Sequence, residues 1–111
     1  MKLDESTELK IQEIQLFEQQ LQGFLMEKQV IQGEYNEVNN ALDEIKKTDD
    51  EVYKVLGGIM IKANKKTLSE ELQERKKIAE VRINALEKQE KLVQNKILVL
   101  RDEINAVLTK K

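Results

Sequence analysis

The sequence contains no cysteine, no histidine and no proline, and it has only four glycines and 4% aromatic residues. Without cysteine the chain forms no disulfide and has no thiol chemistry. Without histidine it lacks the commonest general base and metal ligand. No Gly-rich phosphate loop with a following Lys-Ser/Thr is present. Because a nucleophile, a base and an orienting group cannot be assembled, we expect no enzyme, no catalytic or metal site and no cofactor.

Long apolar runs are also lacking. No run approaches the ~20 residues that a membrane span needs, and the first residues lack the apolar core of a signal peptide. These absences predict a cytoplasmic protein without a membrane partner. The net charge is −2, with cations scattered among acids, and this disfavours a nucleic-acid partner.

The sequence is instead rich in charged residues, 36%, and in hydrophobic residues, 40%. That profile is typical of long helices, and the length fits one domain, 1–111. A first helix is expected over 5–48 and a second over 65–108. In both, apolar residues recur in heptads, the pattern of a coiled coil. The first seam, spaced alternately by three and four, is Ile14, Phe17, Leu21, Phe24, Lys28, Ile31, Tyr35, Val38, Leu42 and Ile45. The second seam is Leu72, Ala79, Leu86, Val93, Leu100 and Val107, with companions Lys76, Ile83, Glu90, Ile97 and Ile104.

Charge indicates how the helices pair. Residues 1–48 carry five lysines and ten acids, whereas residues 64–111 carry twelve cations and eight acids. Opposite signs favour pairing of the two helices with each other, as an antiparallel coiled coil. The alternative is that each helix pairs with another chain. In the antiparallel register the charged seam residues Lys28 and Glu90 lie in adjacent layers, so we expect them to approach each other.

The start of the second helix has two candidate caps. Thr67-Leu68-Ser69-Glu70 matches a capping box, in which Thr67 and Glu70 satisfy backbone donors reciprocally. Asn64 is the alternative cap.

Residues 52–63 do not fit a helix. Two β-rich runs flank Gly57-Gly58, a strong signal for a two-residue hairpin turn because a type I′ turn needs positive φ at both central residues. This turn places Leu56 opposite Ile59. The alternative is a plain loop.

Both hairpin faces are largely apolar, and a lone ribbon is marginally stable, so we expect hairpins to dock onto one another. The residues expected to carry this assembly, here called the hairpin set, are Val52, Tyr53, Val55, Leu56, Ile59, Met60 and Ile61.

Six apolar residues lie off the seams and near the termini. Antiparallel pairing brings them to one end, farthest from the hairpin. A contiguous apolar patch usually marks a binding surface, although single exposed apolar residues are common and carry no meaning. This tip set, expected to bind substrate, is Leu9, Ile11, Leu16, Leu98, Val99 and Leu108.

The order of these features resembles the β-type subunit of prefoldin. The most specific part is the Val-Tyr-Lys-Val-Leu-Gly element over 52–57 with the Ile61-Lys62 that follows. The likeness covers about residues 8 to 108. It has one hairpin between the helices, as in the β-type, whereas the α-type has two.

The resemblance implies a mainly α subunit whose hairpins join into an intersubunit β-barrel of two α-type and four β-type chains. It further implies an ATP-independent co-chaperone whose coiled-coil tips hold non-native client proteins and pass them to a group II chaperonin. A second hypothesis is a coiled-coil scaffold or adaptor that binds a folded partner. An adaptable apolar tip favours the holdase, and a specific polar-rimmed groove favours the scaffold.

Overall fold

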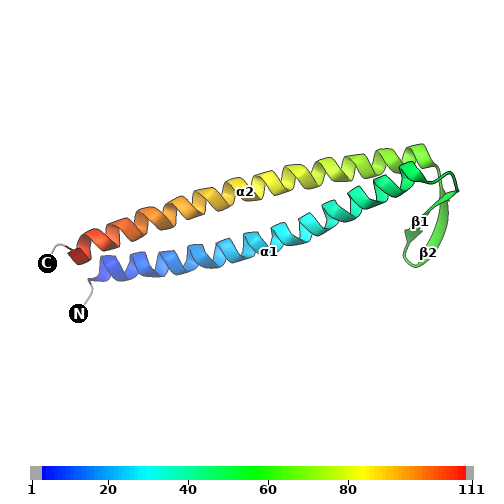
Figure 1. Cartoon of the computed structure of the whole chain (residues 1–111). Coiled ribbons are helices and arrows are strands. Elements are labelled where there is room, and N and C mark those ends of the chain that lie inside the picture. The colour runs from blue at the N-terminus through cyan, green and yellow to red at the C-terminus, as the bar shows by residue number, and fades with distance from the viewer. Residues whose placement is uncertain (1–3, 110–111) are drawn as a thin grey trace. The chain divides into compact units, whose positions relative to one another are not determined.

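The computed structural model describes residues 4–109, so the ends of the expected domain, 1–3 and 110–111, lie outside the described residues. Two long helices flank a short antiparallel hairpin (Figure 1). The elements are α1 (Glu5–Lys47), β1 (Val52–Leu56), β2 (Ile59–Ala63) and α2 (Lys65–Thr109). This arrangement confirms the predicted fold class. The described chain forms two compact units, which we call the hairpin unit, residues 30–83, and the terminal unit, whose described residues are 4–29 and 84–109.

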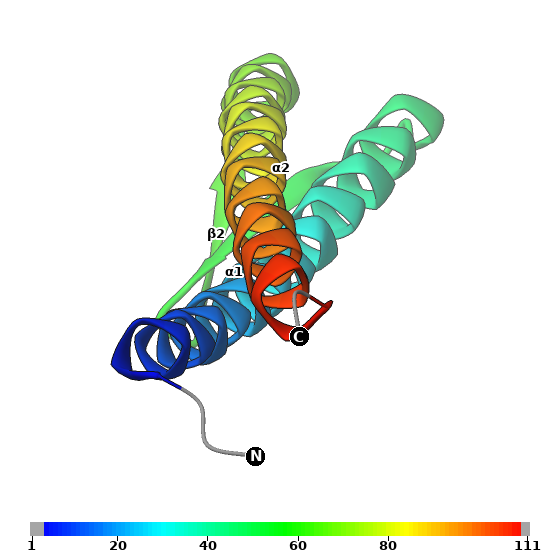
Figure 2. The same ribbon diagram turned by 90° about the vertical axis from the view of Figure 1, so that its left-hand side faces the viewer.

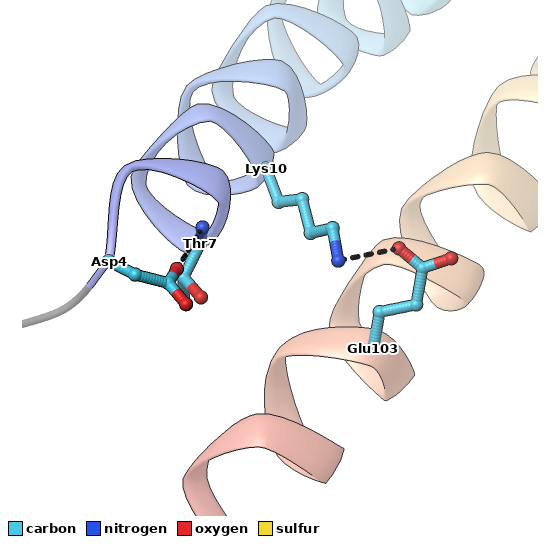
Figure 3. Close-up of polar contacts among 4 residues, drawn as sticks. All are labelled: Asp4, Thr7, Lys10 and Glu103. Carbon is cyan, nitrogen blue, oxygen red and sulfur yellow. Dashed lines mark hydrogen bonds and ion pairs between the residues drawn. The ribbon is translucent and has the colours of Figure 1, made fainter.

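The two helices begin at side-chain caps. At α1, the Asp4 carboxylate accepts a hydrogen bond of 2.7 Å from the backbone N–H of Thr7 (Figure 3). At α2, the side-chain oxygen of Asn64 accepts from the N–H groups of Lys66 at 2.9 Å and Thr67 at 3.2 Å. An oxygen at this position satisfies donors that the first turn leaves unpaired. The expected capping box at Thr67 is therefore wrong, because Thr67 already lies inside the helix and Asn64 is the cap.

The hairpin unit contains a buried cluster of seam residues. Heptad residues of α1 and α2 meet there, and the first residue of β1 and two further apolar residues pack against them. The buried residues are Val38, Leu42, Ile45 and Leu72, and those packed against them are Ala41, Val52 and Leu68. The two helices are also joined across the seam edge by an ion pair of 3.1 Å between Glu34 and Arg75. This core supports the base of the hairpin.

A polar clasp closes the base of the hairpin. The helix α1 ends at Lys47, one residue before the expected limit. The next residue, Thr48, accepts a 3.2 Å hydrogen bond at its hydroxyl from the Asp50 N–H. Its carbonyl accepts a 2.6 Å hydrogen bond from the Lys65 ammonium at the start of α2. A cation at this point also suits the negative end of the α1 dipole.

In the terminal unit the first half of α1 and the second half of α2 run antiparallel, and their ends lie side by side (Figures 1 and 2). Leu86, Val93 and Ile97 of α2 are buried at the seam. The α1 seam residues from Ile14 to Phe24 are half-buried. Ion pairs cross between the helices, from Lys10 to Glu103 at 3.2 Å (Figure 3) and from Arg101 to Glu18 at 3.0 Å.

One predicted seam residue, Val107, is 41% exposed.

Candidate functional site

The hairpin has the predicted turn and register. Gly57 and Gly58 have φ of 53° and 83°, the left-handed region that glycine adopts without a steric penalty. Leu56 pairs with Ile59, as expected, and the ladder continues to the pair of Val52 with Ala63. The strand residues therefore alternate between two faces.

Most of the hairpin set is exposed. Val55 and Ile59 are each 65% exposed and Met60 is 67% exposed, and Tyr53, Leu56 and Ile61 are exposed as well. Val52 is half-buried because it packs on the core of the hairpin unit. An open groove runs between β1 and the helices, and its apolar lining includes Ala41, Ile45, Leu68 and Leu72. The hairpin thus presents apolar surface that nothing within this chain covers among the described residues.

Backbone groups add to this surface. Within the described chain the sheet has two strands, so each strand keeps one edge whose N–H and C=O groups face outward. Such edges are templates for pairing with another strand. An apolar ribbon with two open edges is suited to assembly through β-strand addition.

Charged side chains hold the hairpin in place. The Lys54 ammonium lies 2.9 Å from a Glu71 carboxylate oxygen and joins β1 to α2. Across the strands, Lys62 lies 2.9 Å from Glu51, and the Tyr53 hydroxyl donates to the same carboxylate at 3.0 Å. The Lys62 ammonium, followed by the Tyr53 hydroxyl, lowers the pKa of Glu51 below its ordinary value of 4.5.

In the terminal unit, five residues of the tip set are exposed. Leu9 and Leu16 are 59% and 60% exposed, Leu98 and Val99 are both 56% exposed, and Leu108 is exposed to a smaller degree. Ile11 is half-buried and contributes less open apolar surface than the other five. The tip set is thus divided between the two helices of one unit.

A groove lies beside Leu98. Leu21 and Ile97 of the seam contribute to its lining, together with Gln94. The ion pair between Glu18 and Arg101 also lines it. This is a polar-rimmed apolar groove.

Sequence reasoning missed three exposed apolar residues of the terminal unit. Leu25, Met26 and Leu92 are 49%, 67% and 62% exposed. The signal that identified the tip set, an apolar side chain outside the heptad seam, applies equally to them. They differ from the tip set only in lying farther from the termini.

The charged seam residues meet as expected. The Lys28 ammonium lies 3.0 Å from a Glu90 oxygen, and the two side chains are 21% and 18% exposed. This Glu90 oxygen is itself shielded from solvent. An ion pair thus replaces an apolar layer within the terminal unit, and we expect it to help fix the register.

Known proteins share this architecture. The family model of the prefoldin subunit matches residues 8–111. The chain belongs to the prefoldin subunit family. Prefoldin subunits are coiled-coil proteins of the chaperone class that form hetero-oligomeric complexes with other prefoldin subunits.

The similar relatives are prefoldin beta subunits. The chain is 41% identical to prefoldin subunit beta of Pyrococcus furiosus over 98 residues, which cover 86% of this chain and 84% of that protein. It is 37% identical to prefoldin subunit beta of Pyrococcus abyssi, with the same coverage. The crystal structure of the prefoldin beta subunit from Thermococcus strain KS-1 superimposes with a TM-score of 0.91 at 34% identity, covering 99% of this chain and 98% of that one.

Two further findings concern binding chemistry. Among residues 4–109 no helix is long and apolar enough to cross a bilayer. The same described residues contain no cluster of three or more potential metal-ligating side chains.

Proposed function

We propose that this chain acts as a β-type prefoldin subunit, an ATP-independent holdase that captures non-native proteins and passes them to a group II chaperonin. Its proposed partners are α-type subunits, in a complex of two α-type and four β-type chains in the cytoplasm. The hairpin set joins the subunits, and the tip set contacts the client. The observation that carries the proposal is the division of exposed apolar residues between two units, one with open strand edges and one without.

The exposed tip set supports client capture on energetic grounds. A non-native client exposes apolar segments, and burial of apolar surface is worth roughly 25 cal/mol per Å². One tip offers little area, while association itself costs several kcal/mol. Several tips on one assembly raise the effective concentration. Each contact is then weak and reversible, while the combined binding is strong.

The groove beside Leu98 favours a second candidate function. A scaffold that binds one folded partner uses a shaped apolar groove with a polar rim, and the Glu18–Arg101 ion pair forms such a rim. This candidate predicts dependence on the rim charges and on a particular partner.

The test of the proposed function is a six-fold serine variant of the tip set. We expect helicity and oligomer mass to stay nearly unchanged, because five of the six side chains are exposed. Suppression of the aggregation of a chemically unfolded client should fall greatly. The measurement is turbidity against time without ATP.

Matched variants separate the two candidates. Leu25→Ser with Met26→Ser removes exposed apolar surface outside the tip set and should protect clients as the parent does. Glu18→Gln with Arg101→Gln removes the rim charges and should also leave holdase activity intact. Full protection by the six-fold variant would place client binding elsewhere and overturn the tip assignment.

A further inference from the structure

Each helix of the terminal unit carries a second heptad stripe outside the seam. The α1 stripe consists of Leu9, Leu16 and Gly23, and the α2 stripe consists of Ala85, Leu92, Val99 and Ala106. All seven residues are exposed. Apolar and small residues that repeat every seven positions form the surface that another helix contacts in a coiled coil. The occupant suited to each stripe is therefore a helix.

Both stripes lie on the same side of the helix pair. Leu16 comes two residues after the seam residue Ile14. Each of the other stripe residues likewise comes two residues after a seam position of its own helix, such as Leu92 after Glu90. In an antiparallel pair, residues with equal offsets face the same side. The ion pair of Glu18 with Arg101 illustrates this rule on the opposite edge, because each follows a seam residue directly and their charged atoms lie 3.0 Å apart.

The two stripes have complementary sizes. Two cross-helix ion pairs, Lys10 with Glu103 and Lys28 with Glu90, set the heights of the two helices within one chain, and their residue numbers sum to 113 and 118. When a second copy lies alongside at the same height, residue numbers that sum to about 115 come opposite each other. Leu16 then faces Val99 of the second copy, and Gly23 faces Leu92. A large side chain meets a smaller one in each layer, which allows close packing.

The charges beside the stripes include one attractive and one repulsive pair. Residues three and four positions apart are neighbours on a helix, so Glu27 flanks the α1 stripe, and Lys88 and Lys96 flank Leu92 of the α2 stripe. At the same-height alignment, Glu27 is level with Lys88 of the second copy. Near the end of the unit, Glu13 is level with Asp102, and these like charges oppose the contact.

We infer that the stripe-bearing face of the terminal unit packs against the same face of a second copy, α1 stripe on α2 stripe. The two copies point in the same direction and are related by a two-fold axis along the helices. The contact is self-complementary, as a two-fold interface requires. It involves few large side chains, fewer than a stable independent dimer needs. It therefore depends on copies being held together, which the proposed hairpin assembly supplies through effective concentration.

The contact would also regulate client binding, a point that rests on the proposed function. It covers Leu9, Leu16 and Val99, which belong to the tip set. An idle assembly would shield half of the tip set, and a client would displace one copy from the other.

The test uses disulfide trapping, since the chain contains no cysteine. Two full-length chains of different mass, one with Leu16→Cys and one with Val99→Cys, are mixed, assembled and oxidised. The mixed disulfide should exceed a matched control, Gln22→Cys with Lys91→Cys, several-fold. The control positions are exposed, have nearly the same summed number, and lie on the opposite face. Equal yields from the two mixtures would overturn the inference.

Charge variants give an independent readout. Lys88→Glu should lower the 16–99 cross-link several-fold, and Asp102→Lys should raise it, because it removes the repulsion with Glu13. A yield that responds to neither change would contradict the alignment. Addition of an unfolded client should lower the yield. If the specific cross-link forms but the client leaves it unchanged, the self-contact stands and the tip assignment of the proposed function is wrong.

Discussion

The hairpin unit and the terminal unit both expose large apolar side chains, but they differ in the backbone beneath them. In the hairpin unit, Val55 and Met60 lie on strands whose outer edges have unpaired backbone groups. In the terminal unit, Leu16 and Val99 lie on helices whose backbone groups are paired internally. A partner of the hairpin gains main-chain hydrogen bonds and a fixed register, whereas a partner of the terminal unit gains side-chain contacts alone. The first surface is suited to permanent assembly and the second to reversible binding.

The seams of the two units also differ, in how completely their side chains are buried. The hairpin unit has a contiguous buried cluster around Leu42 and Leu72. The terminal unit has the Lys28–Glu90 pair in its seam and half-buried residues such as Phe17 along α1. Local stability follows buried apolar contacts. The hairpin unit, which joins the subunits in the proposed function, therefore has the firmer core.

The largest effect is expected from a double variant that disrupts the apolar surface of the hairpin. Val55→Asp with Ile61→Asp places charges on opposite faces of the ribbon, and burial of an unpaired charge is strongly unfavourable. We expect the assembly to dissociate to chains of 12.9 kDa that remain helical. Light scattering and circular dichroism measure the two properties.

Its control makes the same charge change on exposed helix positions of the same unit, Asn40→Asp with Gln73→Asp, and should keep the parental mass. If the hairpin double variant also kept that mass, the hairpin would not be the assembly element.

The next effect concerns the charged layer of the terminal unit. Lys28→Met leaves the shielded Glu90 oxygen without its cation and should lower the free energy of unfolding by about 2 kcal/mol. Lys28→Met combined with Glu90→Leu restores an apolar layer and should recover most or all of that loss. Thermal denaturation followed by circular dichroism gives the coupling energy.

Lys91→Met removes an exposed lysine from the same unit and should change little. A coupling energy near zero would show that the Lys28–Glu90 pair contributes nothing to the register.

A smaller effect distinguishes the two candidate caps of α2. Asn64→Ala removes the acceptor for two backbone donors and should destabilise the hairpin unit by about 1 kcal/mol. Thr67→Ala should stay within about 0.5 kcal/mol, because Thr67 contributes its backbone rather than its hydroxyl to the cap. Chemical denaturation compares the two variants, and the reverse order of stability would restore the capping box.

The smallest expected effect is the pH dependence of the contacts that Glu51 makes with Lys62 and Tyr53 in the hairpin. The pKa of Glu51 is lowered by Lys62 and Tyr53, so the folded state favours its ionised form. The stabilisation of the folded state by the ionised Glu51 carboxylate is fully present above pH 4.5, the ordinary pKa of the group. It is lost as the pH falls through the lowered pKa of the folded state. The melting temperatures of the parent and of Glu51→Gln should therefore differ slightly at neutral pH and converge in acid. A difference in melting temperature that persists or widens in acid would show that these contacts do not stabilise the protein through the ionised Glu51 carboxylate.

The hairpin and both seams could be predicted from the sequence because their signals are local and repeated. Gly57-Gly58 fixes the turn by its backbone requirement, and the register follows by counting outward. The charged layer was predictable because Lys28 and Glu90 are charged residues at seam positions that come to adjacent layers in the antiparallel register. Each of these features depends on spacing alone, which antiparallel pairing preserves.

The cap and the exposures required the three-dimensional structure. Asn64 and Thr67 both satisfy local capping rules, and the choice depends on β2 ending at Ala63, which leaves Asn64 as the first residue available to cap. Ile11 and Leu16 are both apolar and off the seam. Ile11 is half-buried because it lies beside the helix interface, whereas Leu16 lies farther around the helix. The salt bridges along the edges depend on the rotamers of long side chains, which periodicity does not specify.

The clasp at the base of the hairpin has a mechanical consequence. The carbonyl of Thr48, directly after α1, accepts the Lys65 ammonium of α2, and the Val52–Ala63 pair closes the ladder close by in the sequence. Both strands are thus anchored at one point that is shared by the two helices. We therefore expect a load applied to the hairpin to be shared between α1 and α2. A force on the hairpin would then reach both helices together, through their shared attachment at its base.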